Sequence, residues 1–206
     1  MVGVRLCVLF FFAQLEAEPE AMAKKTRPFV SMTHVVACPV IETERLKLRG
    51  HTPADLDASA AMWGDPEVTR FIGGKPATRE ETWGRLLRYA GHWPLLRYGY
   101  WLVEEKRSGR FVGEVGFADM KRDIAPPLDG MPESGWALAG WAHGQGFATE
   151  AVKAAIAWGD AHFGARTTTC IISPENTASI RVAEKCGYRE YARTTYKGAP
   201  TIQFRR

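Results

Sequence analysis

Hydrophobic and polar positions in this chain repeat with two periods. A period of two is typical of strands, and a period near 3.6 is typical of helices. The longest helical stripe runs from Ala148 to Phe163 and predicts a core-packed helix over residues 146–163. Alternation, or β-branched runs bounded by turn residues, predicts strands at residues 41–49, 98–105, 111–117, 135–142, 167–172, 188–195 and 200–206.

Capping signals place the remaining helices. Threonine N-caps followed by proline, or by an acid three residues later, begin helices at Thr52 and Thr78. Gly187 ends another amphipathic run. The expected helices cover residues 52–63, with a short second piece at 66–71, and residues 78–89 and 177–185. The order β-α-α-β-β-β-α-β-α-β-β predicts a mixed α/β sheet with helices on both faces.

Two stretches show neither period. Residues 121–132 contain four prolines or glycines in turn positions, so we expect a long loop that is either functional or a surface excursion.

Residues 1–40 are expected to be an N-terminal extension, and residues 41–206 a single domain. An apolar run at 6–13 resembles a signal-peptide core but is too short to span a bilayer. Because Met22 resembles a second translation start, we expect residues 1–21 to be a mis-assigned start or a disordered extension rather than an export signal.

Composition excludes several classes of protein. The 206 residues are 46% hydrophobic, which suffices for one substantial core. The net charge of +4 is modest and its lysines and arginines are scattered, so neither nucleic acid nor membrane is the expected partner. Four cysteines without a C-x-x-C pair argue against structural zinc and fit the reducing cytoplasm; no metal is expected.

The stretch with the most chemical content is His143-Gly144-Gln145-Gly146-Phe147-Ala148-Thr149-Glu150-Ala151, between a predicted strand and a predicted helix. Its glycines let the backbone approach a ligand, and the helix start directs unpaired N–H groups at one point. This arrangement suits a phosphate; a plain turn is the alternative. No Gly-Lys-Ser/Thr follows, and position 149 is Thr instead of Gly, so neither common nucleotide-binding pattern is present.

Three blocks, in this order, resemble the GNAT superfamily of N-acetyltransferases, in particular the Rim-type group whose known members acetylate the N-termini of ribosomal proteins. The blocks are Thr43-Glu44-Arg45-Leu46-Lys47-Leu48-Arg49, the stretch His143 to Ala151, and Asn176-Thr177-Ala178-Ser179-Ile180-Arg181-Val182-Ala183-Glu184-Lys185-Cys186-Gly187-Tyr188. The resemblance implies the GNAT acyl-CoA N-acyltransferase fold, with a mixed, mostly antiparallel central sheet, a splayed strand pair and helices on both faces.

The resemblance also implies acetyl-CoA as the acyl donor. The pyrophosphate would be held by backbone N–H groups of the glycine-containing loop, and the pantetheine arm would pair with the strand before it. Asn176 as a plain N-cap, Ser179 as a first-turn residue and His143 as a surface residue are the alternative roles. The residues implied in cofactor binding are Leu138, Ala139, His143, Gly144, Gln145, Gly146, Phe147, Ala148, Thr149, Asn176 and Ser179.

Acetyl transfer to an amine needs a neutral amine, a hydrogen-bond donor for the developing oxyanion and a proton for the leaving thiolate. Glu133 is the candidate base, where many family members carry a carboxylate, and an exposed glutamate at the start of a strand is the alternative. Glu104 and Glu114 are further candidates. Ser179 is the candidate proton donor, because Ala183 stands where many family members have a tyrosine.

We therefore expect a cytoplasmic enzyme that transfers an acetyl group from acetyl-CoA to a primary amine by direct attack. The acceptor is either a protein N-terminus or a small molecule. Ala183 motivates an alternative, a catalytically weak acyl-CoA-binding sensor on the same fold. An exposed edge strand near the C-terminus could pair two subunits into a homodimer.

Overall fold

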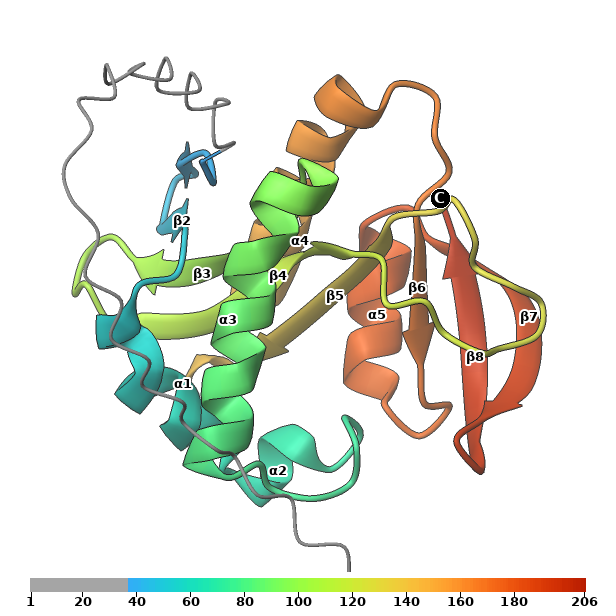
Figure 1. The fold of residues 1–206 in the computed structure, drawn as a ribbon, viewed down its shortest axis with the longest axis horizontal. Coiled ribbons are helices and arrows are strands. Elements are labelled where there is room, and N and C mark those ends of the chain that lie inside the picture. The colour runs from blue at the N-terminus through green and yellow to red at the C-terminus, as the bar shows by residue number, and fades with distance from the viewer. Residues whose placement is uncertain (1–36) are drawn as a thin grey trace, which may run out of the picture. The chain divides into compact units, whose positions relative to one another are not determined.

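The computed structural model describes residues 37–206 (Figure 1). The expectations for residues 1–21 lie outside this range. Just ahead of the expected domain start, Pro39 already belongs to the packed domain, because its carbonyl accepts a hydrogen bond from Trp101 Nε1 at 2.8 Å. Cys38 packs against the same core.

Within the described residues, eight strands form one sheet in the order β1-β2-β3-β4-β5-β6-β8-β7. The strands are β1 (Ile41–Glu42), β2 (Leu46–Arg49), β3 (Tyr100–Glu105), β4 (Phe111–Ala118), β5 (Glu133–Leu138), β6 (Thr169–Ile172), β7 (Arg189–Tyr196) and β8 (Ala199–Arg205). The helices are α1 (Leu56–Trp63), α2 (Pro66–Thr69), α3 (Arg79–Leu96), α4 (Phe147–Phe163) and α5 (Thr177–Lys185), with single 3₁₀ turns η1 (Pro53–Asp55) and η2 (Gly140–Ala142).

The pairing of β5 with β6 differs from every other pairing in this sheet. It is parallel, whereas the other neighbouring strands are antiparallel. It also registers at one position only, Glu133 opposite Thr169, although both strands continue beyond it. We call the unpaired stretch that follows the β5–β6 opening. The predicted splayed strand pair and the mixed, mostly antiparallel sheet are thus confirmed.

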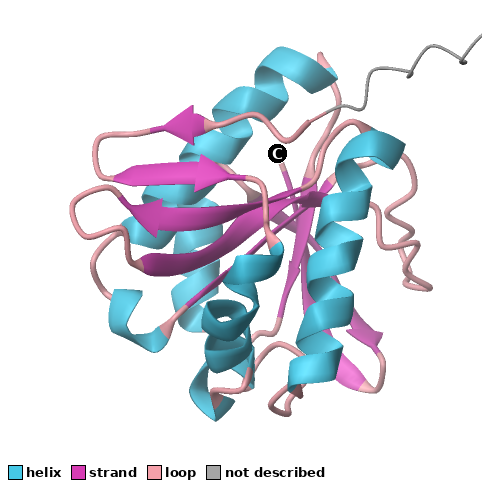
Figure 2. Cartoon of the chain, turned by 60° about the vertical axis from the view of Figure 1, so that its left-hand side comes forward, coloured by secondary structure: helices cyan, strands magenta, loops and turns pink. Residues whose placement is uncertain are grey.

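Helices cover both faces of the sheet, as Figure 2 shows. On one face α4 packs over β2, β4 and β5 and buries Val152 and Ala155 completely, so the predicted helical stripe is a core surface. On the other face α3 packs over β3 and α1 over β4: Ser59 and Trp63 of α1 both bond to Glu114 of β4. Beyond the opening, α5 continues the α4 side and buries Ala183 in the same core.

Local turns interrupt one predicted strand and end another early. The strand expected over residues 41–49 is interrupted, because Thr43 Oγ1 accepts from the N–H of Leu46 and forms a turn between β1 and β2. The strand expected over residues 135–142 starts earlier, at Glu133, and ends at Leu138. There the N–H of Ala142 bonds back to the carbonyl of Ala139 and forms η2. In both cases local hydrogen bonds override an extended pattern.

The predicted loop over residues 121–132 is not a free surface excursion. We call residues 119–132 the strap; it is the yellow loop that crosses β6 and β8 in Figure 1. Two of its own side chains, Ile124 and Leu128, are buried. Gln203 of β8, which has no exposed surface, donates to the carbonyl of Pro126 at 3.0 Å. The strap therefore covers β6 and β8 on the face opposite α5.

None of the helices in residues 37–206 combines the length and the apolar character needed to cross a membrane.

Candidate functional site

The loop between η2 and α4 owes its shape to two glycines. Gly144 and Gly146 both have positive φ, 74° and 81°, a region in which other residues are strained. Gly146 is the N-cap of α4, and Phe147, only 2% exposed, anchors the first turn in the core. The chain therefore leaves β5 and enters α4 through a tight turn on the protein surface.

This turn leaves a series of backbone donors without partners. Among the described residues no acceptor takes the N–H groups of Gly144 to Thr149. The first N–H groups of a helix have no helical partner, and the helix dipole adds partial positive charge at the same point. Successive free N–H groups of this kind form a binding site for an anion. The geometry thus fits the pyrophosphate that the sequence led us to expect there.

A carboxylate behind the loop fixes its position. Glu150 accepts from Thr43 Oγ1 at 2.6 Å, from the Arg45 N–H at 3.0 Å and from Arg45 Nε at 2.7 Å. Arg45 Nη1 also donates to the carbonyl of Gln145 within the loop at 3.0 Å. Burial raises the pKa of Glu150, but the hydrogen bonds from Thr43 and Arg45 outweigh it and leave the pKa below its usual value. The turn between β1 and β2 and the loop therefore form one clamp.

The strand before the loop directs backbone groups of alternate residues toward the opening. Ala139 N–H donates to the carbonyl of Val112 in β4, and alternation then directs the backbone groups of Trp136 and Leu138 away from β4, toward β6. Leu138 therefore faces the opening as expected. Ala139 does not: its N–H bonds to Val112, and its carbonyl accepts from Ala142. On this edge Trp136 takes the position expected for Ala139.

His143 turns back onto the strand that precedes it. Its ring nitrogen Nε2 lies 2.9 Å from the carbonyl oxygen of Leu138, so Nε2 carries the proton and donates. The residue is exposed. Gln145 similarly bonds through its side chain to the carbonyl of Trp141 at 2.6 Å. These two side chains stabilise the turn, and the loop donors that remain free are those of the backbone.

The late block lies beside the loop. Because β5 and β6 are parallel, the loop after β5 and the start of α5 after β6 meet at the same edge of the sheet. Asn176 is the N-cap of α5, and its Oδ1 accepts from the Ser179 N–H at 3.0 Å. Ala183 is fully buried, and Tyr188 lies in the core with its hydroxyl 3.0 Å from Thr168 Oγ1. The expected core position of Tyr188 is confirmed.

Glu133 occupies the closed end of the opening, where β5 and β6 still pair. Its two oxygens accept from Nε and Nη2 of Arg122, in the strap, at 2.6 and 2.7 Å. Arg122 Nη1 also donates to the Tyr196 hydroxyl at 3.2 Å. Burial lowers the pKa of Arg122, but the bonds to Glu133 outweigh burial and raise it above its usual value. The guanidinium is therefore permanently charged and fixes the carboxylate in one orientation.

The two other candidate carboxylates lie elsewhere. Glu104 accepts from Arg49 at 2.9 and 2.5 Å, two strands away from β5. Glu114 has no exposed surface and accepts from Ser59 Oγ and Trp63 Nε1, both at 2.9 Å. These contacts tie α1 to the sheet. Both residues therefore have structural partners and do not reach the opening.

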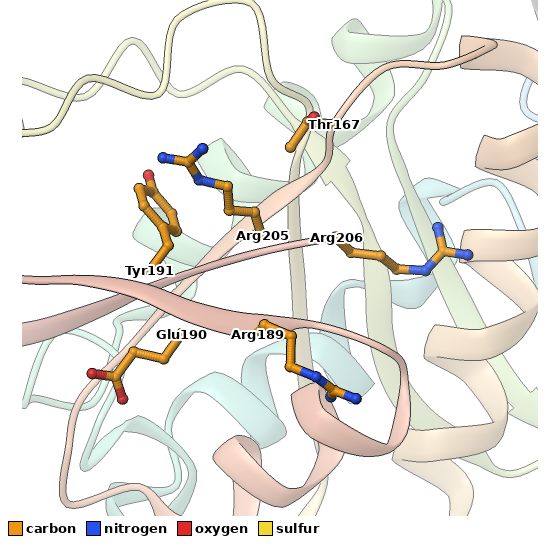
Figure 3. A pocket seen from close by; sticks show the side chains of 6 residues that line it. All are labelled: Thr167, Arg189, Glu190, Tyr191, Arg205 and Arg206. Atoms are coloured by element: carbon orange, nitrogen blue, oxygen red, sulfur yellow. The ribbon is translucent and has the colours of Figure 1, made fainter.

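Surface hollows lie at both edges of the sheet. One is beside the loop and includes Gly146, Thr149, Lys153 and Lys185, so two lysines flank the free backbone donors. The other, in Figure 3, is at the beginnings of β6 and β7 and the end of β8, where Arg205 lies beside Tyr191 while Arg206 is directed away. Since the β5–β6 opening widens toward the opposite edge of the sheet, this second hollow is not part of the candidate site.

The sequence did not reveal the partners of these site residues. Arg122 lies in a loop without periodicity, so nothing local predicted that it would hold Glu133. Thr43 and Arg45 belong to a recognised block, but Glu150 follows Arg45 by 105 positions. The charge of Glu150 in the first turn of a helix was the only available signal, and it equally fits a plain helix-dipole interaction.

Comparison with known proteins agrees with this geometry. Residues 45–189 match the acetyltransferase (GNAT) domain family. The uncharacterized protein YkkB of Bacillus subtilis is 31% identical over 161 residues, which cover 75% of this chain and 87% of YkkB. A solved GNAT-family acetyltransferase from Bordetella pertussis is also 31% identical, with a TM-score of 0.72 over 82% of this chain and 99% of that chain. RimL, a ribosomal L7/L12 alpha-N-protein acetyltransferase solved with coenzyme A, is 16% identical with a TM-score of 0.66 over 82% of this chain and 97% of RimL, which shows a shared fold.

Proposed function

This chain belongs to the GNAT acetyltransferases, which use acetyl-CoA as acyl donor, and on that premise we propose that it acetylates a primary amine by direct attack on the thioester. The observation that carries the proposal is the set of free N–H groups from Gly144 to Thr149 at the start of α4. Lys153 and Lys185 beside them add positive charge suited to a cofactor that carries several phosphates.

The dimensions of the opening support a long, narrow ligand. From Leu138 to Glu133 the strand rises over five residue-to-residue steps, roughly 16 Å. The phosphates of acetyl-CoA would lie at the loop, and its pantetheine arm would pair with the backbone of Leu138 and Trp136. The thioester would then lie toward Glu133. Asn176 and Ser179, at the start of α5, would flank the arm.

Glu133 is the proposed base. A carboxylate oxygen can accept more than one hydrogen bond, so Glu133 can bind a water while Arg122 holds it. That water would take the proton of the attacking amine. Ser179 is the proposed proton donor to the leaving thiolate; no side-chain hydrogen bond within residues 37–206 engages its hydroxyl.

The Rim-type likeness favours a protein N-terminus as the acceptor, and a small amine is the other candidate. The missing tyrosine at Ala183 supports a second function, an acyl-CoA sensor that binds without turnover.

We also propose a cytoplasmic location, consistent with three free thiols at Cys38, Cys170 and Cys186. The outer edge of β7 is open in the described chain and is the proposed contact for a homodimer.

The test is a calorimetric titration with acetyl-CoA, followed by turnover with a panel of N-terminal peptides and small amines. Micromolar binding with transfer to at least one amine is the expected result. Tight binding with no transfer to any acceptor would favour the sensor. Absence of binding would reject the cofactor site.

A further inference from the structure

One row of residues crosses β3, β4 and β5 and ends at the opening. Tyr100 is opposite Gly116, and Gly116 is opposite Gly135. Directly opposed residues in antiparallel strands place their side chains on the same face of the sheet. Two consecutive positions of this row therefore carry no side chain, and the face beside Tyr100 is bare as far as the edge of β5.

The Tyr100 ring uses this space. Its hydroxyl oxygen lies where a side chain at Gly135 would begin, since a Cβ built on Gly135 would be 2.0 Å from it. On its other side the ring stacks on Tyr89 of α3, with centroids 4.2 Å apart and planes 7° apart. Tyr100 is thus held in one orientation, and its hydroxyl is delivered to the rim of the opening.

The hydroxyl has no assigned partner there. Within residues 37–206 the Tyr100 hydroxyl makes no hydrogen bond. It is also not one of the fully buried side-chain atoms without a partner, so it keeps some exposed surface. Gly135 and Glu133 are two residues apart on β5 and so share the α3 face of the sheet. The opposite face of the opening is covered by α4 and α5, where Ala183 is fully buried. An acceptor must therefore approach from the side that Tyr100 occupies.

We propose that the Tyr100 hydroxyl binds the acceptor amine, accepting a hydrogen bond from its N–H beside Glu133. In the transfer, which rests on the proposed function, the nitrogen bonds to the carbonyl carbon of the thioester and the C–S bond breaks. The sulfur leaves with the electron pair, and the proton of the nitrogen passes through water to Glu133. Tyr100 keeps its own proton throughout.

The electrostatic surroundings fit this role. Burial, with smaller contributions from Tyr89 and Glu133, raises the pKa of Tyr100 well above its usual value, against the opposing charges of Arg122 and Arg85. The phenol therefore remains neutral at any working pH. A neutral hydroxyl can accept from an amine without repelling it or titrating.

The test compares three variants and one control variant of the full chain with wild type. Tyr100→Phe keeps the stack on Tyr89 and removes only the hydroxyl. Gly135→Ala adds a methyl group that would displace the hydroxyl. In the double variant most of the clash is relieved, because the nearest remaining ring atom, Tyr100 Cζ, is 3.2 Å from the added Cβ, a contact that a small shift of the ring accommodates. Tyr98→Phe is the matched control, since Tyr98 packs on Phe163 away from the opening.

We expect Tyr100→Phe to lower kcat/KM for the acceptor at least tenfold, mainly through KM, with unchanged acetyl-CoA affinity and melting temperature. Gly135→Ala should lower both activity and melting temperature, and the double variant should regain stability without activity. Activity of Tyr100→Phe within twofold of an active wild type would overturn this inference alone. A wild-type protein that acetylates no amine would overturn the proposed function and this inference with it.

Discussion

The two ends of β5 differ in how their polar groups are satisfied. At Glu133 the strand still pairs with β6, and a charged side chain is held by the fork of Arg122. At Leu138 the pairing has stopped, and beyond it the backbone donors of Gly144 to Thr149 remain free. Side-chain charge is neutralised internally where the sheet is closed. Backbone polarity is left unsatisfied where the sheet is open, which is where a ligand can satisfy it.

Removing the cation at the closed end should have the largest effect on stability. Arg122→Ala would leave Glu133, whose side chain is 10% exposed, without its partner. We expect the free energy of unfolding to fall by about 3 kcal/mol. In a domain of this size that loss lowers the melting temperature by roughly 10 °C, measurable by calorimetry.

A matched control exists on β7. Arg193 forms an equivalent fork to Glu190, but the two side chains are 66% and 41% exposed. Arg193→Ala should leave the melting temperature unchanged, because solvent screens the pair. Equal melting temperatures for Arg122→Ala and Arg193→Ala would show that burial does not make the Arg122–Glu133 pair more stabilising than an exposed pair.

Distorting the open end should strongly weaken cofactor binding, with a smaller effect on stability than the loss of Arg122. Gly146→Val forces a β-branched residue into a φ of 81° and places its Cβ 3.4 Å from the Arg45 guanidinium. We expect acetyl-CoA affinity to fall about 100-fold in a calorimetric titration, because the free N–H groups no longer converge. Gly198, in the β7–β8 turn, has a φ of 80°, and a Cβ added there has no atom within 4 Å, so Gly198→Val is the matched control. That variant should share the backbone strain and keep the affinity.

The smallest effect concerns the clamp behind the loop. Glu150→Gln keeps the size of the side chain and removes the charge that Arg45 and Thr43 hold. Because the loop is then less preorganised, we expect acetyl-CoA to bind about fivefold more weakly. Asp160→Asn, which breaks an exposed pair with Arg206 further along α4, should not change affinity. Equal weakening in both variants would contradict the clamp.

The same carboxylate gives a pH signature. The pKa of Glu150 is lowered below its unfolded value of 4.5, so its contribution to stability is fully present above pH 4.5. It is lost as the pH falls through the depressed folded value. Glu150→Gln should therefore flatten the acid side of the stability curve, measured by denaturant unfolding between pH 5 and about pH 2.5. An acid limb identical to wild type would show that Glu150 is not coupled to folding.

Local signals in the sequence predicted most elements of the fold. Thr78 begins α3 and Gly187, with a φ of 89°, follows the end of α5, because caps and positive φ act within a few residues. Because these signals act only within a few residues, two strand predictions were wrong where more distant or turn-forming contacts decide. The strand predicted over residues 41–49 breaks at Thr43, whose neighbours include Glu150 of a distant helix. The strand predicted to reach Ala142 ends at Leu138, because η2 forms there.

By itself the sequence determined the loop, the helix that follows it and the family, because glycines, caps and contiguous motifs are recorded in neighbouring residues. Only the tertiary structure decided how the site is assembled. The divergence of β5 from β6, the Arg122–Glu133 pair and the placement of Tyr100 on Gly135 join residues from separate elements. Such contacts depend on strand order and register, which follow from packing of the whole core and leave no periodic trace along the chain.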